Sequence, residues 1–262
     1  MTFDFHIGAS PLLVSMPHVG TDLPPAIERR LSEAARRLPD TDWHLERLYD
    51  FTQAYGASVI RARLSRYVVD LNRPPDDADL YPGRNTTGLC PIGTFANEPI
   101  YRPGQEPSSD EVAERVEKYW RPYHEQLAAA LTGIREQHGY ALLWDAHSIR
   151  SRVPFLFEGR LPDLNLGTAR GGACPPRLAA RLEVAAKGVR GYTAVLDGRF
   201  TGGHITRRYG APAAGVVAAQ LELAQITYME ERHPFAFSDR KARRLRPVLR
   251  TLLDTFAAWS PA

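Results

Sequence analysis

Short runs of consecutive apolar residues, separated by polar and turn-forming stretches, mark the predicted strands of this chain. The clearest run is Ala141–Trp144, which follows Gly139 and ends at polar residues. This pattern is typical of a buried strand in a parallel or mixed sheet. Val216–Ala224 has the same character, except that Glu222 interrupts it. Further runs predict strands at 11–15, 57–61 and 66–73, a strand end at 163–168, and a strand at 192–196.

Helical spacing of apolar residues predicts helices between these strands. Ser108–Glu111 forms a capping box ahead of a stripe that reaches about residue 138, and Pro122 should bend or divide that helix. The other predicted helices cover 26–37, a segment capped by Asp40 or Thr41, 176–187 and 238–259. Residues 74–108 are rich in Pro, Gly, Asp, Asn and Thr, which predicts a long loop whose Gly83–Gly88 part could serve as a lid or contact a substrate.

Composition narrows the class of protein. The 262 residues, 44% hydrophobic and 24% charged, suit one large α/β domain over 1–262. We expect no membrane partner, because no apolar run reaches about 18 residues and no secretory signal opens the chain. Two cysteines argue against a disulfide framework and favour the cytoplasm. The net charge of +3 is spread along the chain, which argues against nucleic-acid binding and is compatible with a small anionic substrate.

Polar side chains that follow the predicted strands are the candidates for chemistry. Asp145 and His147 stand two residues apart where the central strand ends, so on extended backbone they point to the same side. Open α/β sheets bind ligands at the carboxyl ends of their strands. The competing interpretation is an aspartate that caps a turn and a loop histidine. His18 lies on the loop after the first strand, and Asp40 and Asp42 together exceed what a helix cap requires.

Two imidazoles, one carboxylate and an open position match a catalytic zinc site. We therefore predict that His18, Asp42 and His147 bind Zn²⁺ or another divalent metal. A glutamate in a core strand is costly unless it is paired or functional. Glu222 is predicted to act as the general base toward the attacking water.

Arginine and amide side chains are the candidates for substrate contacts. Arg66 is predicted to stabilise an oxyanion, and Asn72 and Arg73 to hold a substrate carboxylate. The glycine-rich stretch 197–210 lets the backbone approach a ligand closely, and there His204 and Arg207 are predicted to add donor groups. The competing interpretation of this stretch is a flexible, hairpin-like loop.

Six motifs, in order and over nearly the whole chain, resemble N-formylglutamate amidohydrolase. They are Ser15–Gly20, Asp40–Trp43, Asp70–Pro74, Trp144–Arg150, Gly202–Gly210 and Gln220–Met229. The resemblance implies hydrolysis of N-formyl-L-glutamate to formate and L-glutamate, the last step of one histidine-degradation route. We expect the enzyme to be cytoplasmic and a monomer or small homo-oligomer. The resemblance also implies a three-layer α/β fold. That fold has a central mixed, mostly parallel sheet flanked by helices, as in zinc carboxypeptidases and aspartoacylases.

The wider fold group also bears on individual site residues. Glu222 matches its glutamate base on a late strand, and Arg66-Tyr67 and Asp70–Arg73 match motifs of the aspartoacylases. The first metal motif of that group is His-x-x-Glu, whereas Thr21 stands three residues after His18 here. The identity of the carboxylate ligand is therefore open, and we choose Asp42 over the alternatives Asp40, Asp22 and Glu46.

Three other functions compete with this prediction. A zinc-dependent deacylase of another acidic N-acyl amino acid would share the metal and the base but differ around the acyl group. A metal-free hydrolase would use Ser148 as nucleophile, although the chain has no Gly-x-Ser-x-Gly elbow. A binding domain without activity would gain nothing from the carboxylate of Glu222 in a buried strand.

Overall fold

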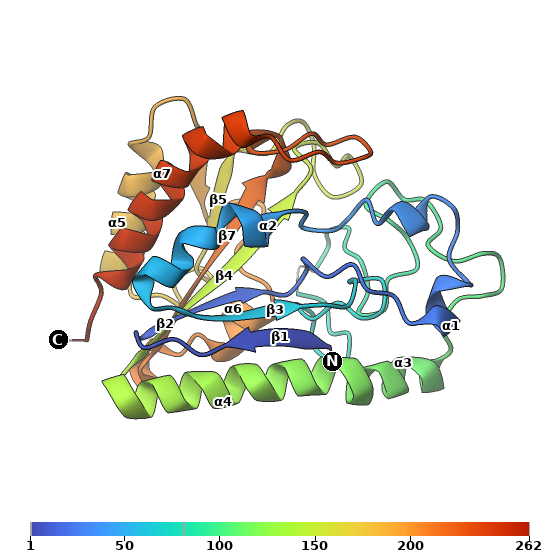
Figure 1. Cartoon of the computed structure of the whole chain (residues 1–262), viewed down its shortest axis with the longest axis horizontal. Helices are drawn as coiled ribbons and strands as arrows, with labels where there is room; N and C mark the ends of the chain where they lie inside the picture. Colours follow the sequence, from blue (N-terminus) through green and yellow to red (C-terminus); the bar gives the residue numbers. More distant parts are fainter. Residues whose placement is uncertain (1, 81, 262) are drawn as a thin grey trace.

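A seven-stranded mixed sheet forms the centre of the computed structural model, which describes residues 2–80 and 82–261 (Figure 1). The strands are β1 Phe3–His6, β2 Leu12–Met16, β3 Ser58–Ala62, β4 Ala141–Ile149, β5 Leu164–Gly167, β6 Ala194–Leu196 and β7 Val216–Ala224. They lie in the order β1-β3-β2-β4-β7-β5-β6. β3, β2, β4 and β7 are mutually parallel. β1 pairs antiparallel with β3, and β5 pairs antiparallel with β7 and parallel with β6.

Helices cover both faces of this sheet. The α-helices are α1 Pro25–Glu28, α2 Leu45–Leu48, α3 Ser109–Arg115, α4 Arg121–His138, α5 Pro176–Lys187, α6 His204–Tyr209 and α7 Asp239–Ala257. The 3-10 helices are η1 Ala35–Arg37, η2 Asp50–Tyr55, η4 Pro212–Ala214 and η5 Gln225–Thr227, and η3 Val116–Trp120 is π-helical. α2, α5 and α7 pack on one face, and α4 and α6 on the other (Figure 1). The predicted three-layer α/β sandwich is confirmed.

The central strands are buried on both sides. In β4, Leu142 and Trp144 join the core beneath α5 and α7, whereas Ala141 and Leu143 join the core beneath α4. All nine residues of β4 and all nine of β7 are buried. This double coverage explains why both strands are continuous apolar runs rather than alternating ones.

The strand predicted at 66–73 is wrong, because these residues form consecutive turns. Val68 N donates to Ser65 O, and the carboxylate of Asp70 accepts from Asn72 N at 2.9 Å, an interaction that favours a turn over a strand. Side chains replace the missing ladder partners. Arg115 Nη1, for example, donates to Val68 O at 2.9 Å. For residues 66–73, the apolar composition therefore predicted correctly that the segment is buried, but it predicted the wrong backbone conformation.

Other predicted elements also differ from the structure. α2 follows His44, with no side-chain hydrogen bond at its cap, and is not capped by Asp40 or Thr41 as predicted. Residues 26–37 contain only the short α1 and η1 rather than one helix. The stretch 197–210 contains the helix α6. By contrast, residues 74–108 contain no α-helix or strand among the described positions, as predicted for a long loop. None of the described helices is long and apolar enough to cross a membrane.

Candidate active site

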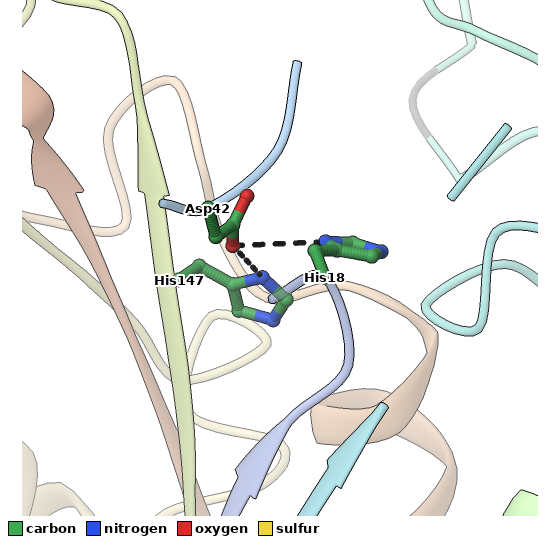
Figure 2. Close-up of side chains that lie close together, drawn as sticks. All are labelled: His18, Asp42 and His147. Carbon is green, nitrogen blue, oxygen red and sulfur yellow. Dashed lines mark hydrogen bonds and ion pairs between the residues drawn. The ribbon is translucent and has the colours of Figure 1, made fainter. Parts of the chain in front are cut away.

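Three side chains of the types that bind metals converge at the carboxyl ends of β2 and β4 (Figure 2). His18 lies two residues past β2, His147 lies within β4, and Asp42 precedes α2. Oδ2 of Asp42 lies 3.2 Å from Nδ1 of His147 and 3.8 Å from Nδ1 of His18. One donor atom from each residue lies within 4.8 Å of the others, and all three residues are buried.

Local backbone contacts bring Asp42 to the two histidines. Asp42 N donates to His18 O at 3.0 Å, which joins the segment before α2 to the loop after β2. Gly20 allows that loop to pass close to the chain at Leu64, because a Cβ at Gly20 would lie 2.2 Å from Leu64 O. Oδ2 of Asp42 also accepts from Ser148 N at 3.1 Å, which connects it to β4.

A second carboxylate faces the other ring nitrogen of each histidine. Nε2 of His18 lies 2.6 Å from Oδ1 of Asp70, and Nε2 of His147 lies 3.1 Å from Oδ2 of Asp145. Metal-binding histidines usually donate this N–H to such a partner, which orients the ring and fixes the tautomer. In this arrangement the Nδ1 atoms face Asp42. The donor set and its supporting carboxylates therefore fit a divalent cation with two imidazole ligands and one carboxylate ligand.

The alternative carboxylates do not lie in this cluster. Asp40 is buried, but its Oδ2 accepts from Tyr67 Oη at 2.7 Å and from Phe95 N at 2.8 Å. Asp22 is exposed and pairs with Arg63, and Glu46 is exposed. Asp42 is thus the carboxylate of the four that the fold places with the two histidines.

Burial and neighbouring charges set the protonation of the cluster. Burial and the charge of Arg66 lower the pKa of His18. Burial by itself would lower the pKa of His147, but the carboxylates of Asp145 and Asp42 outweigh it and hold that pKa well above its ordinary range. Burial opposes ionisation of Asp42, yet His147, His18 and Arg66 lower its pKa. Without a metal, His147 is therefore an imidazolium beside an ionised Asp42, and a cation has to displace its Nδ1 proton.

Glu222 lies next to this cluster because of strand register. β4 and β7 are parallel neighbours, and His147 pairs directly with Glu222. The glutamate is 7% exposed. Burial, the largest influence, raises its pKa to about 8 in the metal-free chain. Such a carboxyl changes protonation near neutral pH, as a general acid or base must.

The cluster lines a cleft with an empty volume of about 640 Å³ including its open mouth. Arg66, Arg73 and Gln220 line it near the cluster, as does Glu222. The last residue of β4, Ile149, and the surrounding loops complete its wall, the loops with Leu80, Asn85, Thr86, Thr87, Phe95, Leu156, Arg199, Phe200 and Gly203. Three of these residues belong to the stretch 83–88, whose contact with a substrate stays a prediction.

Arg66 is buried and lies against His18. With Nε2 of His18 directed to Asp70, Nη2 of Arg66 faces Nδ1 of His18, the nitrogen that a cation would take, and lies 3.5 Å from Oδ2 of Asp70. Its Nη1 donates to Asp40 O at 3.4 Å. The Arg66 Nε has no hydrogen-bond partner among the described residues. A buried guanidinium N–H without a partner is costly, so it remains available to a negatively charged ligand atom.

Side chains of α4 and of the preceding π-helix η3 hydrogen-bond to the turn that contains Asn72 and Arg73. Trp120 Nε1 donates to Arg73 O at 2.9 Å, and Nε2 of His124 lies 2.8 Å from Leu71 O. His124 is therefore buried rather than on a polar helix face. A π-helical turn shifts side chains relative to an α-helix and often accompanies functional sites. Here it directs Trp120 toward the backbone of the turn.

The amide of Asn72 already has protein partners. Its Nδ2 donates to Oδ2 of Asp145 at 3.4 Å, and its Oδ1 accepts from Ile205 N at 2.8 Å. Gly203 makes room for it, because a Cβ at Gly203 would lie 2.3 Å from Asn72 Nδ2. Asn72 thus contacts Asp145, the carboxylate beside His147, and connects α6 to the site. Its predicted contact with substrate stays a prediction.

His204 and Arg207 do not line the cleft in the described part of the chain. The His204 ring lies 5.7 Å from Trp120 and 5.4 Å from His124, and Arg207 is exposed with its Nε donating to Gly202 O. Their roles in substrate binding stay predictions. Ser148 Oγ lies 2.7 Å from Tyr228 Oη and 3.3 Å from Gln225 Nε2, contacts that do not activate a nucleophile.

Arg199 and Gln220 are two polar cleft residues that sequence reasoning did not assign to the site. Gln220 pairs with Asp145 across β4 and β7, and its Nε2 lies 3.4 Å from Oε2 of Glu222. It lies two residues before Glu222 and therefore on the same face of the strand, and this spacing could have predicted that Gln220 belongs to the site. Arg199 lies in the glycine-rich stretch 197–210, where His204 and Arg207 were chosen instead. No sequence pattern separated Arg199 from the other polar residues of that stretch.

Comparison with known proteins identifies close relatives. A family model described as N-formylglutamate amidohydrolase matches residues 10–229. A relative from Pseudomonas aeruginosa, named N-formylglutamate deformylase, is 55% identical over 97% of this chain and 96% of its own. A second, from Pseudomonas putida and with the same name, is 54% identical over 97% of this chain and 95% of its own.

Solved structures agree with the fold. The crystal structure of an N-formylglutamate amidohydrolase from Ralstonia eutropha JMP134 is similar with a TM-score of 0.80 and 26% identity, over 97% of each chain. A gene product of Agrobacterium tumefaciens is similar with a TM-score of 0.71 and 16% identity, over 98% of this chain and 95% of its own, and so shares the fold.

Proposed function

The chain belongs to the N-formylglutamate amidohydrolase family, and on that premise we propose that it hydrolyses N-formyl-L-glutamate to formate and L-glutamate with a bound divalent metal, zinc being our choice. The observation that carries the metal-dependent part is the donor cluster of His18, Asp42 and His147 beside Glu222. We further propose that this reaction is the last step of a histidine-degradation route. One cytoplasmic catalytic domain would perform it, and the two buried free cysteines suit a reducing compartment.

His18, Asp42 and His147 would hold the cation through two Nδ1 atoms and one carboxylate oxygen. When bound, such a cation acts as a Lewis acid toward water and the amide carbonyl. Asp70 and Asp145 accept the Nε2 protons, keep both rings in the ligating tautomer and raise the basicity of Nδ1.

Glu222 would move the proton. A carboxylate here takes a proton from the attacking water and returns it to the leaving amine, which otherwise departs as a poor anion. Burial favours its protonated form, and nearby positive charge favours the ionised form. The site therefore needs the cation for Glu222 to act as a base at neutral pH.

Arg66 and Arg73 would handle negative charge on the substrate. The Nε of Arg66 has no partner among the described residues and would donate to the oxyanion that develops from the formyl carbonyl. Arg73 is half-buried, lines the cleft and would bind a substrate carboxylate. Asn72, whose amide lies against His147 and Asp145, would orient that part of the site.

The direct test is formate release from N-formyl-L-glutamate by metal-free and zinc-restored protein. Activity that disappears with the metal and returns with zinc would support both substrate and metal. Activity indifferent to the metal would retain the substrate and remove the metal site. Hydrolysis of N-acetyl-L-glutamate or N-acetyl-L-aspartate without formate release from the formyl compound would favour the alternative, a deacylase of another acidic N-acyl amino acid.

A further inference from the structure

We propose that Arg199 binds the side-chain carboxylate of the substrate and thereby makes the cleft selective for N-acyl amino acids with an acidic side chain. This inference rests on the proposed function, because it concerns the substrate of that same site. It assigns a specificity-determining role to a residue that resembles no catalytic motif in the sequence.

Arg199 reaches the cleft from a different segment than the other cleft arginines. Arg66 and Arg73 belong to the turns that follow β3, whereas Arg199 lies between β6 and α6. All three line the same cleft. An N-acyl glutamate carries two carboxylates in addition to the amide that reacts. Arg66 lies against His18 at the metal cluster, which leaves Arg73 and Arg199 as the cleft arginines for the two carboxylates.

The guanidinium of Arg199 is held in place by two neighbouring loops. Its Nε donates to Leu156 O at 2.8 Å, and its Nη2 donates to Asn85 O at 3.1 Å. Its Cζ lies 5.2 Å from the centre of the Phe200 ring. These hydrogen bonds restrict the guanidinium of Arg199 to one position at the wall of the cleft. Such preorganisation lowers the entropic cost of binding an anion.

The loop that carries Arg199 is itself anchored. Oδ1 of Asp197 accepts from Thr168 N at 2.8 Å, and Ala169 N donates to Thr201 O at 2.6 Å. These contacts fix both sides of Arg199 against the segment that follows β5. The arginine is therefore presented from a fixed part of the fold, as specificity residues require.

The charge of the cleft suits a dianion. Among the described cleft residues, three arginines face three carboxylates, namely Arg66, Arg73, Arg199, Asp42, Asp70 and Glu222. The imidazoles add no charge once they bind a metal. A divalent cation would add positive charge to this balanced lining, which favours a substrate with two carboxylates over one with a single carboxylate.

The test compares two substrates that differ only in the charge of the side chain, N-formyl-L-glutamate and N-formyl-L-glutamine. The kcat/KM for formate release would be measured for the zinc-loaded protein and for Arg199→Gln. We expect the substitution to lower kcat/KM for the glutamate substrate about 100-fold and to change it less than about threefold for the glutamine substrate, because only the former loses a charge-assisted bidentate contact. Equal losses on both substrates would overturn the proposal, since a merely structural role affects both.

Two further variants control the comparison. Arg84→Gln removes a charge from the neighbouring loop, where Arg84 is exposed, does not line the cleft and donates to Arg199 O at 3.3 Å. We expect it to leave the preference for the charged substrate unchanged. Arg73→Gln should lower kcat/KM on both substrates, because both carry the α-carboxylate. Loss of selectivity in Arg73→Gln instead of Arg199→Gln would overturn the assignment.

Two other outcomes, misfolding of the variant and failure of the proposed function, can be distinguished from failure of this proposal. If Arg199→Gln does not fold, the unaltered protein decides: a preference of less than about threefold for N-formyl-L-glutamate over the glutamine analogue would overturn the proposal, because a charge contact predicts far more. If the unaltered protein releases no formate from either compound, the proposed function fails. The same variants are then compared on N-acetyl-L-glutamate and N-acetyl-L-glutamine, with the same criterion.

Discussion

Replacing Glu222 by glutamine should make the metal-free protein more stable at neutral and alkaline pH, and should remove most of the activity of the zinc-loaded protein. In the folded chain Glu222 is 7% exposed and burial raises its pKa to about 8, whereas the ordinary value is 4.5. Between these two values the folded chain holds a proton that the unfolded chain releases. The free energy of unfolding therefore falls as pH rises through this window, and the loss is absent below it and complete above it.

The magnitude follows from the size of the shift. Each unit of pKa difference corresponds to about 1.4 kcal/mol, so the fully developed loss for Glu222 is about 5 kcal/mol. Glutamine has a similar shape and does not titrate. The difference in unfolding free energy between Glu222→Gln and the unaltered protein should grow by about 3 to 4 kcal/mol between about pH 5 and pH 8.

Urea unfolding in the presence of a chelator measures this difference. The metal must be absent because a ligand that binds only the folded state adds its own stabilisation. Glu33→Gln is a matched control, since the Glu33 side chain is 89% exposed, and its pH dependence should follow that of the unaltered protein. With zinc restored, Glu222→Gln should retain the metal and lose roughly 10²- to 10⁴-fold in kcat, the usual contribution of a general base.

Parallel pH curves for Glu222→Gln and the unaltered protein would refute the reasoning about burial. Unchanged turnover would refute the role of the carboxylate in proton transfer. Because the two measurements respond to different properties of the same group, each can fail while the other succeeds.

Three further predictions concern the metal cluster and the helix behind it. Asp42→Asn should lower zinc affinity in equilibrium dialysis by more than about 100-fold, because it removes a charged ligand, whereas Asp40→Asn, whose carboxylate bonds to Tyr67, should change it by less than about threefold. Zinc affinity of the unaltered protein, followed by competition with a chelator, should rise with pH through neutrality, because zinc displaces a proton from His147; a flat profile would contradict this. Burial lowers the pKa of His124 from 6.5 to about 3, so stability is lost as pH falls from about 6.5, and His124→Gln should reduce that slope by about 1.4 kcal/mol per pH unit in urea unfolding.

Several elements could be predicted from the sequence because their signals are local. The helix at 176–187 and the strand at 216–224 have the predicted bounds. Pro175 directly precedes the helix and Gly215 directly precedes the strand, and both residue types commonly mark the start of a new element. The predicted N-cap also formed, with the Ser108 side chain accepting from Glu111 N, although the Glu111 carboxylate pairs with Arg30 and Arg115 instead of completing the capping box. Such features depend on neighbours in the chain and need no knowledge of the fold.

The histidines of the candidate site were predictable for a related reason. His18 and His147 come where apolar runs end, and the carboxyl ends of adjacent parallel strands lie at one edge of a sheet. Glu222 could be singled out because an ionisable group in an apolar run is costly. In each case a polar or ionisable residue was recognisable because it ended or interrupted an apolar run.

The tertiary structure decided what depends on distant partners. Residues 66–73 form turns because Arg115, His124 and Trp120, all at least 42 positions further on, supply donors to their carbonyl groups. Asp42 rather than Asp40 joins the cluster because Tyr67 and Phe95 N hold the latter. The entry of Arg199 into the cleft depends on loops contributed by Leu156 and Asn85. Local apolar patterns determined which segments are buried, whereas the directions of polar side chains depended on hydrogen bonds between segments that only folding brings together.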